Sequence, residues 1–146
     1  MKTALVGISL LLLISVAALA VPQDQAAAIQ PFPKTLLNAR YVYVTAYDGD
    51  QFNPNLLPED RQAIAAVQNA LEQWGRYIVV YRPKDADIII AVQSRGSEDV
   101  LAVYDARGPH AVSSPYLWRA MGREGLQQGE TPLVRQLRQA VEKASK

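Results

Sequence analysis

PEDRQAIAAVQNALEQWG, residues 58–75, is the stretch that decides the fold. Pro58 suits the first position of a helix, and the two acidic residues after it suit the positive end of a helix dipole. Apolar residues then recur at helical spacing: Ile64, Val67, Leu71 and Trp74. Gly75 can end the helix in a left-handed conformation. The pattern therefore predicts an amphipathic helix over residues 58–74, packed by one side against a core.

Three apolar segments follow the helix and predict strands: residues 76–81 (RYIVVY), 86–93 (ADIIIAVQ) and 99–104 (DVLAVY). The links at residues 82–85 and 94–98 are short, so we expect consecutive strands to be antiparallel neighbours in a meander. Residues 88–92 are apolar at every position, which is typical of a strand covered on both faces. This segment is therefore expected at the centre of the sheet.

A fourth strand is predicted before the helix, at residues 40–47 (RYVYVTAY). Its alternation places Val42 and Val44 on one face and the tyrosines between them on the other. If the helix makes the usual right-handed crossover, this strand runs parallel to residues 76–81. The pattern does not say whether the two strands are adjacent.

Two further helices are predicted because Ser114-Pro115 and Thr131-Pro132 each place a proline at a first helical position. The first is short and ends near Met121, and the second runs to about Ala144. The fold predicted is one α+β domain over residues 39–146, in the order strand, helix, three strands, two helices. A single layer of helices is expected on a four-stranded mixed sheet, with the last helix beside the first or across the sheet edge.

Residues 1–20 have the parts of a secretory signal peptide: the basic Lys2, an apolar run over residues 4–14, and Ala18-Leu19-Ala20 as a cleavage pattern. The apolar run is shorter than the roughly 20 residues of a membrane-spanning helix. We therefore expect an exported soluble protein, periplasmic or extracellular, without a membrane anchor after cleavage. A flexible leader rich in Ala, Gln and Pro is expected over residues 21–38.

Composition narrows the possible partners. The chain has no cysteine, so it forms no disulfide and carries no lipid on a cysteine. Loss of Lys2 with the signal peptide leaves as many basic residues as acidic ones, and the basic residues are scattered singly. This distribution argues against nucleic acid or an anionic membrane as the main partner.

The loop DGDQFNPNLLPE, residues 48–59, is the most suggestive metal candidate. Three acidic residues occupy positions 1, 3 and 12 of a calcium loop: Asp48, Asp50 and Glu59. However, Phe52 stands where a ligand belongs, and Asn53 stands where the sharp turn needs glycine. We favour a turn with an acidic helix start and predict no cofactor, although the sequence leaves calcium binding open.

A hydrolytic site is the second chemical possibility. Asp105, His110 and Ser113 or Ser114 lie within ten positions and supply the residue types of a catalytic triad. One loop does not supply the separate supports and the oxyanion hole that a triad needs, and no G-x-S-x-G elbow surrounds either serine. An exposed loop histidine is the favoured interpretation.

Aromatic and arginine residues offer two weaker binding signals. Trp74 with Tyr77, and Tyr116 with Trp118, could stack on a ligand, but packing in the core is favoured for both tryptophans. Six arginines could bind an anion only if folding gathers them: Arg76, Arg82, Arg95, Arg107, Arg119 and Arg123. We favour solvated strand ends and helix faces for these residues.

Short motifs give the chain a family likeness. They are Trp74-Gly75-Arg76-Tyr77, Asp85-Ala86-Asp87 followed by isoleucines, Leu117-Trp118-Arg119, and the helix opened by Thr131-Pro132-Leu133. With these motifs, residues 39–143 resemble an uncharacterised group of small exported bacterial proteins. Residues 40–92 resemble, more distantly, the N-terminal domain of TolB and curli-secretion lipoproteins. The resemblance implies an α/β layer that binds envelope partners, and it transfers no catalytic residue.

We therefore expect an exported, non-enzymatic binding or scaffolding domain of the bacterial cell envelope that binds an envelope protein or a second copy of itself. The alternative is a small envelope hydrolase that uses Asp105, His110 and Ser113 or Ser114. Because residues 88–92 are expected at the centre of the sheet, residues 99–104 are expected at an edge. This edge contains neither the proline nor the lysine that usually protects one, so a partner can pair with it. The predicted partner-binding residues are Val100, Ala102, Tyr104, Tyr116 and Trp118.

Overall fold

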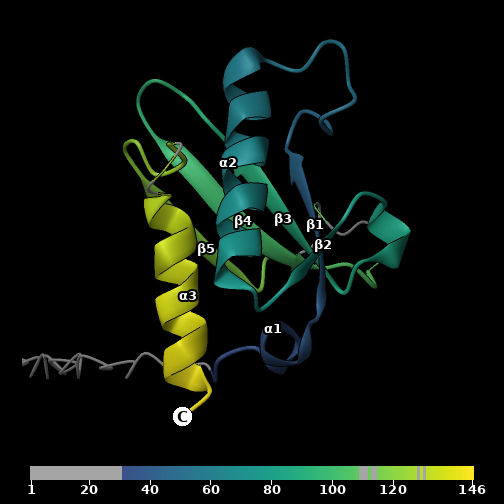
Figure 1. Ribbon diagram of the computed structural model, residues 1–146, viewed down its shortest axis with the longest axis vertical. Helices are drawn as coiled ribbons and strands as arrows, with labels where there is room; N and C mark the ends of the chain where they lie inside the picture. The colour runs from purple at the N-terminus through teal and green to yellow at the C-terminus, as the bar shows by residue number, and fades with distance from the viewer. Residues whose placement is uncertain (1–30, 109–111, 113–114, 128, 130) are drawn as a thin grey trace, which may run out of the picture. The chain divides into compact units, whose positions relative to one another are not determined.

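The computed structural model describes residues 31–108, 112, 115–127, 129 and 131–146. The elements in this part of the chain are α1 (Lys34–Asn38), β1 (Tyr41–Ala46), α2 (Pro58–Trp74), β2 (Ile78–Val80), the 3₁₀ turn η1 (Pro83–Asp85), β3 (Ile88–Gln93), β4 (Asp99–Asp105), β5 (Trp118–Gly122) and α3 (Pro132–Ala144). The predicted α+β class is confirmed, but the sheet has five strands rather than four (Figure 1).

The strand order in the sheet is β2-β1-β3-β4-β5. β1 is parallel to both of its neighbours, while β3 and β5 are each antiparallel to β4. The apolar segment at residues 88–92 lies in the central strand, as its composition predicts. The strands before and after α2 are parallel, as expected for a crossover through the helix, and they are adjacent.

The predicted antiparallel pairing of residues 76–81 with residues 86–93 is wrong, because β1 lies between β2 and β3. The register explains how a short link can join them: Tyr43 is opposite Val80 in β2, and Val42 is opposite Ile88 in β3. The chain therefore has to cross only one strand, a span of about 10 Å, without returning along the sheet. The turn η1 makes this crossing.

The short helix predicted from Pro115 to about Met121 is also wrong, because residues 118–122 form β5. The spacing of Trp118 and Met121 resembles a helical repeat, but exposure alternates along the segment as in a strand with one covered face. Pairing with β4 satisfies the backbone of this segment and takes precedence over its local helical signal.

β4 is consequently not the edge that the sequence predicted. Ala102 is fully buried and is paired with Ala91 of β3 on one side and Arg119 of β5 on the other. The sheet edges are instead β2 and β5. A proline at Ala102 would break a two-sided ladder rather than block a docking edge.

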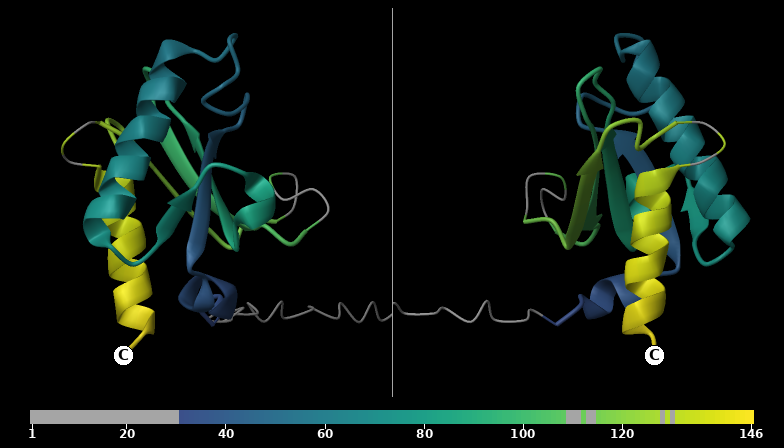
Figure 2. Two further views of the ribbon diagram at one scale, coloured as in Figure 1. Left: turned by 45° about the vertical axis from the view of Figure 1, so that its right-hand side comes forward. Right: turned by 90° about the vertical axis from the view of Figure 1, so that its left-hand side faces the viewer.

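Both long helices lie on the same side of the sheet, with α3 beside α2 (Figures 1 and 2). Their bounds agree with the sequence prediction, and Gly75 ends α2 with a φ of 73°. The main core lies between these helices and one face of the sheet. Its fully buried large side chains include Ile64 and Leu71 of α2, Leu137 of α3, and Ile88 and Ile90 of β3.

Hydrogen bonds made by Arg76, Tyr77 and Asp87 hold α1 and the start of β1 in place. The Tyr77 hydroxyl donates to the Leu36 carbonyl at 3.0 Å, and Arg76 Nη2 donates to the Leu37 carbonyl at 2.8 Å. Asp87 Oδ2 accepts from the backbone amides of Arg40 and Tyr41, each at 3.0 Å. The structure thus places residues 34–38 with the folded domain rather than with a leader, while residues 1–30 lie outside the described residues.

Candidate functional site

The side of the sheet that faces away from α2 and α3 carries no α-helix in the described part of the chain, and we call it the uncovered face in this sense (Figure 2). Single residues from loops and strand ends still pack against it: Val80, Ala86, Ala106 and Val112. Alternation along the strands places on it a second buried cluster: Tyr43, Ile89, Ala91, Ala102 and Tyr104. By the strand registers, Thr45 of β1 and Arg119 and Met121 of β5 extend this uncovered face. Strand tyrosines, Tyr43 and Tyr104, lie on this face, whereas the described strands contribute no tyrosine to the helix-covered core.

A hollow of about 360 Å³ lies on the uncovered face. We call it the tyrosine hollow and define it by its lining: Tyr47, Gln93, Val100, Tyr104, Tyr116 and Arg119. These residues come from the ends of β1 and β3, from β4, and from β5 and the segment before it. Its volume falls in the lower part of the range of small-molecule sites.

Two tyrosines form the inner wall of the hollow. The Tyr47 and Tyr104 hydroxyl oxygens are 2.8 Å apart and share a hydrogen bond, and the rings meet edge to face with centroids 6.5 Å apart. Burial raises the pKa of Tyr47 well above its ordinary value, and the bond with Tyr104 adds to this effect. The Tyr47 hydroxyl therefore remains protonated near neutral pH and can donate a hydrogen bond.

Among the described residues that line the tyrosine hollow, Arg119 is the only basic or acidic one. Its guanidinium lies over the Tyr116 ring, 5.9 Å from the centroid, in a cation–π arrangement. It also lies close enough to Tyr47 to oppose part of the rise in that pKa. No carboxylate of the described residues pairs with Arg119. The hollow thus combines a cation, aromatic faces and hydroxyl donors.

Three of the five predicted partner-binding residues line the hollow: Val100, Tyr104 and Tyr116. Ala102 lies beside them on the same face but is fully buried, while Trp118 faces the other way and packs against the helix-covered core. The edge argument that selected them no longer applies, although the structure still brings three of them together.

Sequence reasoning missed Tyr47, Gln93 and Arg119 as lining residues. A usable signal existed for Tyr47, because alternation from Tyr41 and Tyr43 places it on the same face. Arg119 could not be assigned while residues 115–121 were expected to be helical. Gln93 carries no comparable signal.

The residues of the calcium-like loop have other partners. Asp48 Oδ2 accepts from Arg95 Nη2 at 2.9 Å, and Asp50 Oδ1 accepts from the Phe52 amide at 2.9 Å. The Tyr43 hydroxyl approaches Asp50 Oδ2 at 3.4 Å, and burial followed by the Asp50 charge raises the pKa of Tyr43. Within the described ranges, no three histidine, cysteine or acidic residues gather as metal ligands.

A second polar cluster joins the start of α2 to the end of β3. The Asp60 carboxylate, 1% exposed, accepts from the Ser94 amide at 2.8 Å and from Arg95 Nη1 at 2.9 Å. Hydrogen bonding to Asp60 is the main cause that raises the pKa of Arg95. Asp99, also buried, accepts from the Ser94 hydroxyl and the Leu126 amide. Each carboxylate is held by internal donors, so the cluster is a structural tie between elements.

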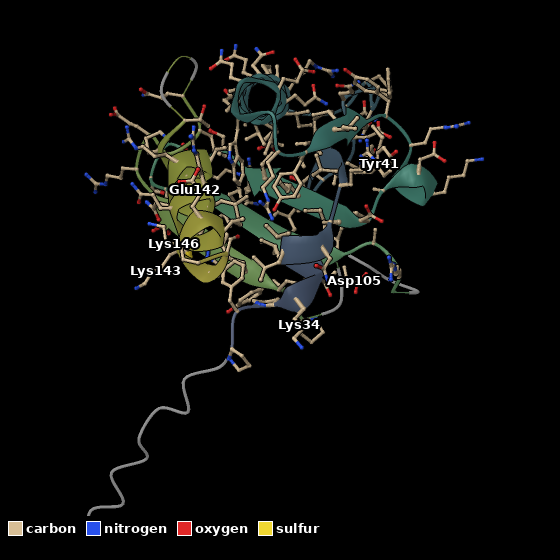
Figure 3. All side chains as sticks on the ribbon, turned by 60° about the horizontal axis from the view of Figure 1, so that its bottom comes forward. Lys34, Tyr41, Asp105, Glu142, Lys143 and Lys146 are labelled. Carbon is tan, nitrogen blue, oxygen red and sulfur yellow. The ribbon has the colours of Figure 1, made fainter. Side chains whose placement is uncertain are left out.

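The hydrolase hypothesis falls largely outside the described residues, since His110, Ser113 and Ser114 are not among them. Asp105 is described: it ends β4, and its Oδ1 accepts from the Arg107 amide at 2.9 Å. Figure 3 places Asp105 on the side of the molecule opposite Glu142, Lys143 and Lys146 of the C-terminal segment.

The remaining sequence candidates are dispersed. Trp74 is half-buried against the core and meets Tyr77 edge to face, with centroids 5.2 Å apart. Several of the arginines have separate partners in the described part of the chain: Arg76 the Leu37 carbonyl, Arg82 Asp85, Arg95 Asp60 and Asp48, and Arg107 Asp87. The arginine set is therefore not gathered into one anion site.

Comparison with known proteins does not indicate a function for this site. No family model matches the chain, and no curated protein or solved structure matches it. Among the described residues, no helix is long and apolar enough to cross a membrane. The case for a function therefore depends on the residues themselves, and the tyrosine hollow is the strongest candidate site.

Proposed function

We propose that the protein is an exported, non-enzymatic binding domain of the bacterial cell envelope, and that it binds through the uncovered face of its sheet. The observation that carries the proposal is the tyrosine hollow, where Tyr47, Tyr104, Tyr116 and Arg119 meet. Tyrosine and arginine are enriched where proteins bind partners, because each combines an apolar body with hydrogen-bond donors. The signal-peptide pattern of residues 1–20 and the likeness to small exported bacterial proteins support the envelope location.

The proposal is tested by affinity capture from envelope extracts of the source bacterium, with the exported protein as bait. The decisive variant is Tyr116→Ala with Arg119→Gln, which removes the outer wall and the charge of the hollow. The matched control is Tyr81→Ala with Arg82→Gln at the opposite edge of the sheet. Tyr81 is 54% exposed and Tyr116 is 53% exposed, so each variant removes one tyrosine of the same exposure and the charge of one arginine.

We expect a partner that the wild type and the control retain equally, and that the hollow variant retains at least about tenfold less, as for loss of an aromatic or arginine anchor. Equal capture by all three proteins would contradict binding through this face. Turnover of a hydrolase substrate, abolished by His110→Ala, would contradict the non-enzymatic assignment. Mass spectrometry of the exported protein checks the expected cleavage after Ala20.

A further inference from the structure

Arg119 determines the sign of charge that the tyrosine hollow can accept. The other lining residues in the described part of the chain are three tyrosines, Gln93 and Val100, and none of them is a carboxylate or a basic residue. The ion pairs of the described residues join other arginines to carboxylates, whereas Arg119 in this part of the chain pairs with no carboxylate and lies over the Tyr116 ring, close to Tyr47. A ligand that carries one negative charge therefore complements this surface.

The tyrosine pair supplies a hydrogen-bond donor that the described part of the protein does not use. Two hydroxyls carry two protons, and their mutual bond uses one of them. Tyr104 is 5% exposed and Tyr47 is 37% exposed, so Tyr47 is the residue of the pair that a ligand can reach more easily. If Tyr104 donates to Tyr47, the Tyr47 proton is directed outward toward an acceptor.

We propose that the tyrosine hollow binds a small organic carboxylate with an apolar body. The guanidinium of Arg119 presents a planar fork that matches a carboxylate, and the Tyr47 hydroxyl donates to the same group. The Tyr116 ring and Val100 contact the apolar body. A single guanidinium balances one carboxylate charge, whereas a phosphate usually recruits several cations or a helix N-terminus. The inference rests on the proposed function, since it assigns a ligand class to the same face.

The test is a titration of the exported protein with benzoate. Benzamide, a neutral molecule of the same shape, is titrated in parallel. NMR chemical shifts of the backbone amides and the tyrosine rings report binding. We expect benzoate to bind with a Kd of about 1 mM, which is reasonable for so small a ligand. Benzamide is expected to bind at least about tenfold more weakly, because it lacks the charge that Arg119 complements.

Three variants locate the effect. Arg119→Gln is expected to remove the preference for benzoate, while Arg123→Gln, a nearby exposed arginine outside the hollow, keeps it. Tyr47→Phe is expected to weaken benzoate binding about tenfold, as for loss of a hydrogen bond to a charged group. Tyr104→Phe is expected to change it less than about threefold, because the outward proton of Tyr47 remains.

The inference is overturned if benzoate and benzamide bind equally, if Arg119→Gln and Arg123→Gln have the same effect, or if no shift appears in the hollow at tens of millimolar benzoate. Unchanged amide spectra of the unliganded variants show that each one is folded. The titration is independent of envelope capture, so absence of benzoate binding beside a face-dependent partner rejects only the ligand class. Benzoate binding without any captured partner rejects only the envelope role.

Discussion

The two faces of the sheet are both buried, but by different means. On β3, Ile88 and Ile90 are fully buried beneath the helices, whereas Ile89 and Ala91 are 6% and 0% exposed on the face without a helix. Aliphatic side chains from α2 and α3 pack on the first face, while Tyr43 and Tyr104, with small aliphatic residues such as Ala106 and Val112, bury the second. The helix-covered face therefore provides most of the packing, while the uncovered face keeps polar atoms close to solvent. A strand buried on both sides can thus serve stability on one face and recognition on the other.

The largest expected effect comes from two adjacent isoleucines of the same strand. Ile90→Ala removes packing beneath the helices and is expected to lower the free energy of unfolding by about 4 kcal/mol. Ile89→Ala removes the same atoms from the uncovered face and is expected to lower it by about 2 kcal/mol, because solvent and the tyrosine rings can occupy the space. Urea unfolding of the protein measures both values.

The residues Ile89 and Ile90 share strand, chemistry and near-complete burial, so each is the control for the other. Equal losses would show that the uncovered face is packed as rigidly as the helix-covered one. That result would count against a surface adapted to receive a ligand.

The next effect concerns the attachment of α2 to the sheet. Asp60→Ala leaves the Ser94 amide and the Arg95 guanidinium without their buried acceptor and is expected to lower the free energy of unfolding by about 3 kcal/mol. Asp48→Ala, which removes the exposed partner of the same arginine, is expected to lower it by less than about 1 kcal/mol. Thermal or urea unfolding compares the two variants, and similar losses would show that burial of Asp60 is not what matters.

The smallest expected effect concerns Asp87, which holds the start of β1 and belongs to neither face of the sheet. The backbone amides of Tyr41 and Arg40 are the main causes that hold the pKa of Asp87 below its ordinary value. Because the folded pKa is lower than the unfolded one, the contribution of Asp87 to stability is present above about pH 4 and is lost as the pH falls through the folded pKa. Asp87→Ala is expected to lower the free energy of unfolding by about 1 kcal/mol at pH 7.

The same variant should unfold more like the wild type as the pH falls below about 4, since protonated Asp87 no longer favours the folded state. A urea series from pH 3 to pH 7 follows this convergence. A constant difference over the whole series would mean that the effect of the substitution comes from lost packing rather than from the charge.

The two long helices could be predicted to the residue because their ends are local. Pro58 and Pro132 start them, and Gly75 ends α2, so nearby residues alone determine these boundaries. The strand order could not be predicted in the same way. The crossing of β1 by η1 depends on a register between segments far apart in the sequence, and β5 forms because β4 offers it a ladder.

The candidate site was only partly predictable for the same reason. Val100, Tyr104 and Tyr116 were selected by an argument about a sheet edge, and they share a hollow because β4 is an inner strand. Arg119 lines the hollow because residues 118–122 form a strand, β5, where the sequence predicted a helix. The pairing of β4 with β5 brings the positive charge of Arg119 to the hollow, and this pairing could not be predicted from the sequence.

The hydrogen bond between Tyr47 and Tyr104 also bears on the order in which the molecule is made. The two residues are 57 positions apart, and the chain between them contains α2, β2 and β3. During synthesis from the N-terminus, β1 is complete long before β3 and β4 exist to hold it. The hollow comes into being only when the last strands have joined the sheet. A ligand that binds there stabilises the finished fold and no earlier intermediate, so its presence would report that assembly is complete.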